Sequence, residues 1–152
     1  HHAGMRSPAQ IIRERPLCPS ENLRSGARAL SIDEVRDLVE AFVRAAERAD
    51  EAGFDGVEVH GAHGYLVCQF LSAEINTRED DYGGSLENRS RFLWEIIAGI
   101  RARCRPDFQV GVRLSPERFA ARSATRRGAS RSHTRSSQFS LRAQGRTAAR
   151  LL

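Results

Sequence analysis

Two helical patterns alternate with two short strand patterns along residues 32–114, which leaves few folds open to the chain. Apolar residues at helical spacing cover residues 32–52, and a short apolar run follows at 56–60. A second helical pattern begins after Ser85, and a second short run covers residues 108–114. Helices that alternate with strands are typical of βα units, whose strands lie parallel in one sheet. The sequence therefore predicts an α/β protein.

The first helix has clear start and stop signals. Ser31 and Glu34 match a capping box, in which each side chain bonds the backbone N–H of the other residue. Gly53 suits the left-handed position that ends a helix, so we expect the helix over about residues 32–52. Its apolar stripe consists of Val35, Leu38, Val39, Phe42, Val43, Ala46 and Ala49.

The second helix is expected to begin at Ser85, a suitable N-cap, with Glu87 in its first turn and Pro106 after its end. Its buried stripe would consist of Phe92, Leu93, Ile96, Ile97 and Ile100. The second strand would place Val110, Val112 and Leu114 on one face.

The other segments are less regular. Prolines at positions 8, 16 and 19 break residues 1–30, which we interpret as a surface excursion. Residues 65–75 are mixed apolar and fit either a short helix or a packed loop. Residues 76–84 form a charged turn region before the second helix.

The charges divide the chain into two parts. Residues 1–119 hold 16 arginines and all 19 acidic residues, whereas residues 120–152 hold eight arginines and no acid. Residues 120–152 also lack apolar periodicity, which predicts a disordered tail. An out-of-frame extension and a nucleic-acid-binding tail are the alternatives, although a single aromatic residue, Phe139, makes nucleic-acid binding the weaker one.

Cysteine usage and hydropathy indicate the setting of the protein. Cys18, Cys68 and Cys104 are far apart and have no metal-ligand spacing, so we expect reduced thiols in a cytoplasmic protein, without an iron–sulfur site. No apolar run approaches the ~18 residues of a membrane span, so no membrane partner is expected.

Polar side chains follow both predicted strands at the points where they end. His60, His63 and Tyr65 follow the first strand, and Arg113 lies near the end of the second. Ligands of parallel α/β folds bind at the carboxyl ends of the strands. Taken alone, the His-x-x-His spacing fits either a metal site or hydrogen-bonding histidines; no third ligand is evident, and we predict no metal.

The segment AGFDGVEVHGAHGYLVCQFLSAEINTREDDYGGSLENRSRFLWEIIAGIR (residues 52–101) and the later VGVRLSP closely resemble the old yellow enzyme family of FMN-dependent NAD(P)H oxidoreductases. The opening HHAGMRSP resembles the family's third barrel strand and the loop after it. The resemblance covers about residues 1–119 and implies a partial (β/α)8 TIM barrel, about strands 3–5 with their helices. A complete barrel needs ~250 residues, more than the 152 of this chain.

The resemblance also implies roles for individual residues. His60 and His63 would hold the carbonyl group of an activated alkene, in a substrate-binding segment that includes Gly61 and Ala62. Tyr65 would be the proton donor, and Arg113 would lie beside N1 and the C2 oxygen of FMN. The implied cofactors are FMN and, as hydride donor, NADH or NADPH. His1 and His2 would lie at the edge of the pocket without an assigned role, and the residues from Tyr82 to Arg89 would be mainly structural.

These roles agree with the chemistry of the side chains. Two imidazole N–H groups can stabilise the negative charge that develops on a carbonyl oxygen when the alkene is reduced, and a guanidinium can stabilise charge on the reduced flavin. A phenol with an ordinary pKa of ~10 stays protonated at neutral pH and can donate its proton. The alternatives are that Tyr65 only caps the pocket and that Arg113 pairs with a strand neighbour, of which Glu58 is the nearest candidate.

The predicted function is thus an FMN-dependent NAD(P)H oxidoreductase that reduces activated C=C bonds, present as an incomplete fragment. The alternatives are a non-catalytic truncated or frameshifted remnant and, more distantly, a protein that binds nucleic acid through a basic tail. The family's other strands, including the loops that hold the FMN phosphate, have no counterpart in the sequence. We therefore expect unpaired sheet edges, low stability and weak FMN binding in the isolated chain.

Overall fold

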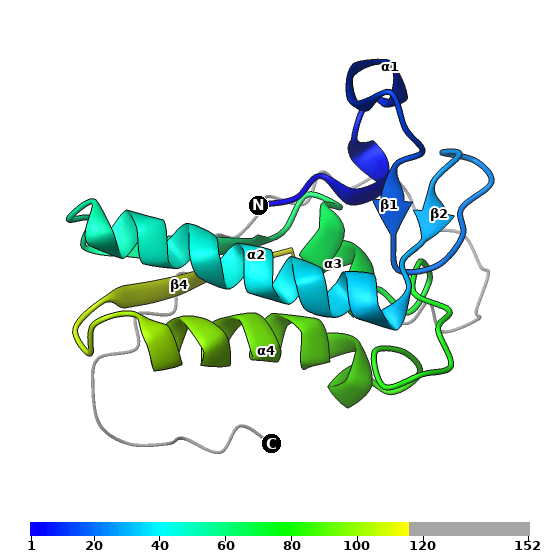
Figure 1. Ribbon diagram of the computed structural model, residues 1–152. Coiled ribbons are helices and arrows are strands. Elements are labelled where there is room, and N and C mark those ends of the chain that lie inside the picture. Colours follow the sequence, from blue (N-terminus) through cyan, green and yellow to red (C-terminus); the bar gives the residue numbers. More distant parts are fainter. Residues whose placement is uncertain (116–152) are drawn as a thin grey trace, which may run out of the picture.

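The computed structural model describes residues 1–115 as one α/β unit (Figure 1). Its elements are η1 (Gly4–Arg6), α1 (Ala9–Ile12), β1 (Leu17–Cys18), β2 (Arg28–Ala29), α2 (Ile32–Glu51), β3 (Gly56–Gly61), α3 (Leu66–Leu71), α4 (Leu86–Arg103) and β4 (Gln109–Leu114). The predicted tail, residues 120–152, lies outside the described residues. Within residues 1–115, no helix combines the length and the apolar character needed to cross a bilayer.

Helix α2 begins and ends as its sequence predicts. The hydroxyl of Ser31 accepts a bond from the backbone N–H of Glu34, and the Glu34 carboxylate accepts one from the N–H of Ser31. The Glu34 carboxylate also pairs with Arg28, which joins the helix start to β2. Gly53 has a φ of 83°, the left-handed conformation in which a residue with a Cβ is strained.

Helix α4 packs against α2. The Ser85 hydroxyl accepts from the backbone N–H of Asn88, which confirms Ser85 as the N-cap. The predicted stripe is confirmed at its four buried positions, Phe92, Leu93, Ile96 and Ile100. Arg103 of α4 forms ion pairs with Glu40 and Glu47 of α2, so charged contacts flank the apolar contact between the helices.

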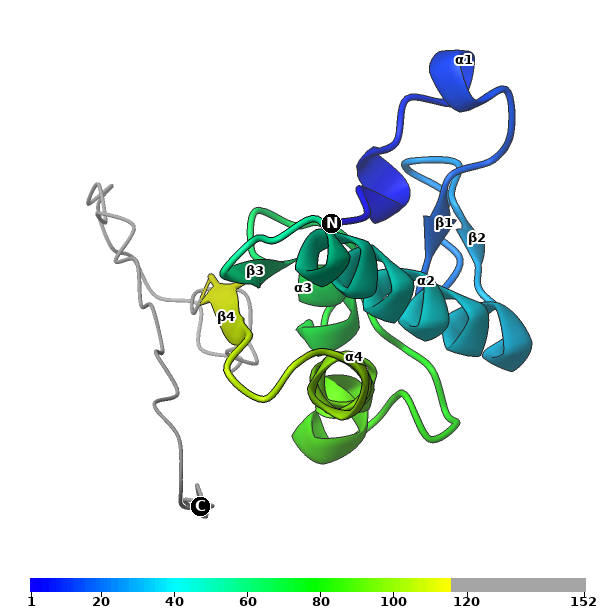
Figure 2. The same ribbon diagram turned by 60° about the vertical axis from the view of Figure 1, so that its left-hand side comes forward.

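Strands β3 and β4 pair in parallel, as expected for βα units, and His60 lies directly opposite Arg113. Figure 2 shows α2 and α4 on the same side of this strand pair. Because side chains alternate along a strand, Val59 and Val110 face the helices, where they are buried. The opposite face carries Glu58, His60, Gly111 and Arg113, and we call it the site face.

The residues from Tyr82 to Arg89 are structural, as predicted. Tyr82 is buried in the core, and its hydroxyl donates to Glu95. Gly84 has a φ of 77° in the turn before Ser85, and Arg89 donates from Nε to the carbonyl oxygen of Leu71. This segment therefore joins α4 to the end of α3.

The excursion of residues 1–30 contains only short elements. A buried guanidinium fixes its second half: Arg78 donates to the carbonyl oxygens of Pro19 and Leu30 and pairs with Asp80. Residues 65–75, which the sequence left as a helix or a packed loop, contain α3 and are largely buried. The stacked rings of Phe70 in α3 and Phe92 in α4, 4.4 Å apart, hold α3 in the core.

Candidate active site

Three of the predicted site residues meet where β3 ends. His60 lies near the end of the strand, His63 in the loop that follows, and Tyr65 at the N-cap of α3. Nε2 of His60 and Nδ1 of His63 are 3.2 Å apart. The rings of His60 and Tyr65 lie 5.2 Å apart between centroids. The structure thus brings both imidazoles and the phenol into one cluster.

His1 joins this cluster from the other end of the described chain. Its ring stacks on Tyr65 at 5.4 Å with an interplanar angle of 14°, and it meets His60 edge-on at 5.8 Å. The sequence placed His1 at the pocket edge without a role. His2, by contrast, turns inward: its Nδ1 accepts from the N–H of Gly4, its carbonyl accepts from Leu66, and burial lowers the pKa of its imidazole.

The backbone of the loop between β3 and α3 fixes where His63 lies. His63 has a φ of 57°, a left-handed conformation that is uncommon for a residue with a side chain, and its N–H donates to the hydroxyl of Ser115 just after β4. Gly61 lies against β4 so closely that a Cβ would come within 3.0 Å of the carbonyl oxygen of Arg113. Gly61 and Ala62 are both buried, so the loop rests directly on β4.

Gln69 supports the cluster through buried hydrogen bonds, a role that the sequence did not predict. Its side chain is fully buried, and its Nε2 donates to the carbonyl oxygens of Gly64 and Ala3. Its Oε1 accepts from the N–H of Met5. One amide therefore joins the segment after His1 to the loop before Tyr65. The available signal was a polar residue inside the apolar run of residues 66–71, because buried polar groups are nearly always hydrogen-bonded.

Arg113 lies on the site face beside His60, and it also makes the contact foreseen as the alternative to a flavin-binding role. Its Nε donates to Oε1 of Glu58 at 2.7 Å. Among residues 1–115, its two terminal nitrogens have no hydrogen-bond partner. Within the part of the chain that the structure describes, the ion pair with Glu58 therefore leaves the two terminal nitrogens available to another group.

The electrostatics of the cluster favour a neutral His60. Burial lowers the pKa of its imidazole below the ordinary value, His63 and Arg113 lower it further, and Glu58 opposes them. A neutral imidazole carries one N–H, which can lie on Nε2. His60 can then donate from the nitrogen that faces His63. Within the described residues, no third histidine, cysteine or carboxylate completes a metal site around this pair.

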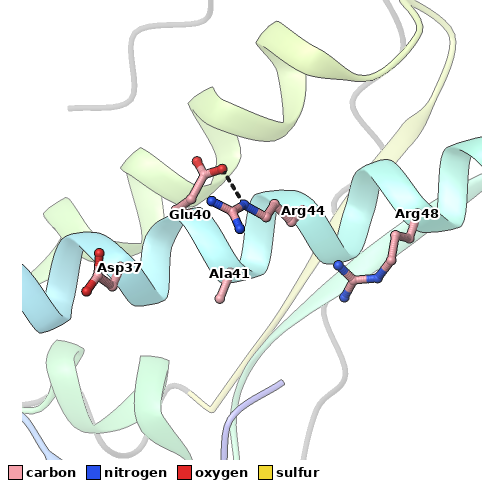
Figure 3. A pocket seen from close by; sticks show the side chains of 5 residues that line it. All are labelled: Asp37, Glu40, Ala41, Arg44 and Arg48. Atoms are coloured by element: carbon pink, nitrogen blue, oxygen red, sulfur yellow. Dashed lines mark hydrogen bonds and ion pairs between the residues drawn. The ribbon is translucent and has the colours of Figure 1, made fainter.

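A hollow of about 390 Å³ lies elsewhere, along the outer side of α2 (Figure 3). Asp37, Glu40, Ala41, Arg44 and Arg48 line it. All five residues belong to one helix, and Glu40 pairs with Arg44 inside the hollow. The hollow is thus a charged helix surface, separate from the cluster at the strand ends.

A parallel α/β unit with polar side chains at the carboxyl ends of its strands has the architecture of the α/β proteins whose ligands bind at that edge. Residues 2–138 match the NADH:flavin oxidoreductase / NADH oxidase family, a match that extends beyond residue 119. The chain belongs to this family, and the resemblance to the old yellow enzymes is confirmed. The cofactors of the family are FMN and NADH or NADPH.

Individual relatives support the assignment. The chain is 53% identical over 89 residues to 12-oxophytodienoate reductase 2 of Arabidopsis thaliana, covering 59% of this chain and 24% of that protein. It is 43% identical over 124 residues to NADH oxidase of Thermoanaerobacter brockii, covering 78% and 19%. The structure of morphinone reductase in complex with tetrahydroNAD superimposes with a TM-score of 0.69 at 38% identity, covering 76% and 37%. The chain therefore spans about a fifth to two fifths of these relatives.

Proposed function

We propose that the chain is part of an FMN-dependent oxidoreductase that uses NADH or NADPH to reduce activated C=C bonds. In this proposal, residues 1–119 supply about the third to fifth strands of a (β/α)8 barrel, with β3 as the fourth and β4 as the fifth. The observation that carries it is the register of β3 and β4, which puts His60 and Arg113 side by side on the site face, next to His63 and Tyr65.

The donor groups of the site face fit the isoalloxazine edge of FMN. When bound, FMN would carry hydride from the nicotinamide to the alkene. Arg113 would bind the N1 and C2-oxygen edge, where negative charge develops on reduction, through its terminal nitrogens. A guanidinium already held in place stabilises such charge without reorganising. Gly111, on the same face, adds no side chain that would obstruct a flat ring.

The two histidines would bind the carbonyl oxygen of the substrate. Nε2 of His60 and Nδ1 of His63 lie 3.2 Å apart, so one ring donates to the other. A carbonyl oxygen would replace this contact and accept an N–H from each ring, with the proton of each ring on the nitrogen that now faces the other. Two such donors stabilise negative charge on the oxygen as the alkene is reduced. The backbone of Gly61 and Ala62 would line this part of the pocket. A carbonyl-bearing substrate agrees with the names of two relatives, 12-oxophytodienoate reductase and morphinone reductase.

Tyr65 would hold the proton that completes the reaction. Its ring contacts the rings of both His60 and His1, which also contact each other, and these contacts restrict the phenol. Its phenol O–H can donate a proton to the α-carbon of the alkene. The stacked His1 ring would keep this hydroxyl in one orientation.

The test uses the full chain together with the strands that the described residues lack. We would coexpress the chain with the two segments of the Arabidopsis relative that flank the matched region and purify the complemented protein. The expected result is bound flavin and NADH-dependent reduction of 2-cyclohexenone. Arg113→Gln should weaken FMN binding by about tenfold or more, since a hydrogen bond to a charged group contributes roughly 1.5–3 kcal/mol.

The matched control is Arg48→Gln, which removes the same charge from the outer side of α2, far from the strand ends. It should leave FMN binding and reduction unchanged. A complemented protein that folds but binds no flavin would contradict the proposal and support a non-catalytic remnant. Equal effects of Arg113→Gln and Arg48→Gln would contradict the role of Arg113.

A further inference from the structure

Glu58 and Arg113 are joined diagonally across the two strands of the site face. Gly111 is the residue opposite Glu58, and His60 is the residue opposite Arg113. Because Gly111 has no side chain, the guanidinium can reach past it to the carboxylate, where Nε and Oε1 are 2.7 Å apart. This contact fixes Arg113 next to His60 rather than in solvent.

The stability of the fold does not account for this contact. The side chains of Arg113 and Glu58 are 37% and 43% exposed, and pairs this exposed contribute at most about 1 kcal/mol. By contrast, Arg78, whose side chain is only 9% exposed, pairs with Asp80 and also donates to two backbone carbonyls, as expected of a structural contact. The consequence of the Glu58 contact is therefore the orientation and the charge of Arg113.

We propose that Glu58 is a positioning residue that holds Arg113 through Nε beside His60 and leaves both terminal nitrogens of the guanidinium directed to the flavin. The flavin part rests on the proposed function. An arginine side chain loses considerable rotamer freedom when it binds a ligand, and a carboxylate that fixes Nε beforehand removes part of that cost. Glu58 itself need not touch the flavin.

The same carboxylate adjusts the charge around His60. The groups that face this imidazole are His1 with its amino group, His63, Tyr65, Glu58 and Arg113. Arg113 and Glu58 act on His60 in opposite directions, because a cation disfavours the imidazolium and an anion favours it. Glu58 thus keeps the charge of Arg113 partly balanced at the site.

The experiment needs no flavin and uses the full chain at a concentration low enough to keep it monomeric. Nuclear magnetic resonance would follow the Nε–H signal of Arg113 and, by pH titration, the imidazole of His60. Glu58→Ala should expose the Nε–H to water and abolish its signal, whereas Glu58→Gln should keep the signal, because an amide oxygen still accepts. Glu58→Gln should lower the measured pKa of His60, and Arg113→Gln should raise it.

Glu21→Gln is the matched control, since Glu21 forms a solvent-exposed pair with Arg15 in the excursion. Glu21→Gln should change neither the Nε–H signal of Arg113 nor the pKa of His60. Circular dichroism should show that all variants are folded. Two results would overturn the proposal. One is an Nε–H signal that is still observed in Glu58→Ala, and the other is a His60 pKa that is unchanged in both Glu58→Gln and Arg113→Gln.

The complemented protein separates this proposal from the proposed function. With flavin bound, Glu58→Gln should shift its midpoint potential in the positive direction and Arg113→Gln in the negative direction. Failure to bind flavin while the Nε–H and His60 responses hold would refute the proposed function and keep Glu58 as the residue that positions Arg113. Flavin binding with an unresponsive Nε–H would refute the role of Glu58 alone.

Discussion

At the scale of single residues, the site depends on imidazoles that stay neutral. Burial lowers the pKa of His60, which belongs to the cluster, and the pKa of His2, which lies outside it. For His60 this neutrality suits a hydrogen-bond donor to a carbonyl. For His2 it suits an acceptor, because Nδ1 receives the N–H of Gly4. The same burial makes the two residues contribute to the pH dependence of folding.

We expect the free energy of unfolding to fall as the pH drops from about 7.5 to about 5.5. The unfolded chain takes up protons on histidine near pH 6.5, whereas folded His2 and His60 resist protonation until lower pH. Acid therefore favours the unfolded chain in this window. Urea unfolding at several pH values measures the effect, and His60→Gln should reduce the slope. A stability that is flat between pH 7.5 and 5.5 would contradict it.

Gln69→Leu should destabilise the chain by about 2 kcal/mol. Leucine has nearly the same size but leaves the buried carbonyl of Gly64 without its partner, which costs roughly 1–3 kcal/mol, and also removes the bond to the part-buried N–H of Met5. Urea unfolding measures the loss. Gln109→Leu, at an exposed glutamine, is the control and should change stability by less than about 0.5 kcal/mol. Equal effects of the two variants would contradict the role of the Gln69 amide in joining the two backbone segments.

The sequence could place His60 and Arg113, because residues at the ends of neighbouring parallel strands come to the same edge. It could not place His1 on Tyr65, since that contact joins segments far apart in the chain. The role of Gln69 could not be predicted for a similar reason. Its partners are backbone groups of residues 3, 5 and 64, and nothing in a sequence marks which backbone groups remain unpaired. The contact of Glu58 with Arg113 was foreseen only as an alternative to flavin binding.

At the scale of elements, local signals predicted the two long helices, α2 and α4, and the strand pair, β3 and β4. The capping box at Ser31 and the N-cap at Ser85 lie where the pattern put them, because both depend on residues within three positions of each other. Residues 65–75 were ambiguous for a physical reason. A short apolar run that is buried on all sides has no polar face, and its periodicity cannot separate helix from packed loop.

Ser31→Ala should lower the free energy of unfolding by about 1 kcal/mol, the usual effect of losing an N-cap. The Glu34 carboxylate keeps its bonds to Arg28 and to the N–H of Ser31, so only the N–H of Glu34 loses its partner. Thermal or urea unfolding measures the change. Ser90→Ala, inside α4, is the control and should cost nothing, because alanine is a better helix former than serine. A Ser31→Ala variant as stable as Ser90→Ala would contradict the capping role.

At the scale of the molecule, the strand pair of β3 and β4 decides how much of the site face is covered. Among the described residues, β3 and β4 pair only with each other, and the site face is partly exposed. Unpaired strand edges invite association with other chains. The site therefore lies on a surface that, in our proposal, the other barrel strands would enclose.

We expect coexpression with the flanking segments of the Arabidopsis relative to change both the association state and the FMN binding of the chain. The chain alone should bind FMN weakly and associate at high concentration, whereas the complemented protein should be monodisperse, more thermostable and yellow with bound flavin. Sedimentation and flavin absorbance measure both. An isolated chain that purifies as a monomer with stoichiometric flavin would contradict the proposal that further strands are needed to complete the site.

The most direct test of the account is the rate at which the flavin-loaded complemented protein reduces 2-cyclohexenone when Tyr65 is replaced by phenylalanine. The ring and its contacts with His1 and His60 remain, and only the hydroxyl is lost. The account predicts that FMN stays bound and that reduction of the alkene slows by about 10²–10⁴-fold, the usual contribution of a positioned proton donor. A Tyr65→Phe variant that reduces the alkene as fast as the unaltered protein would contradict it.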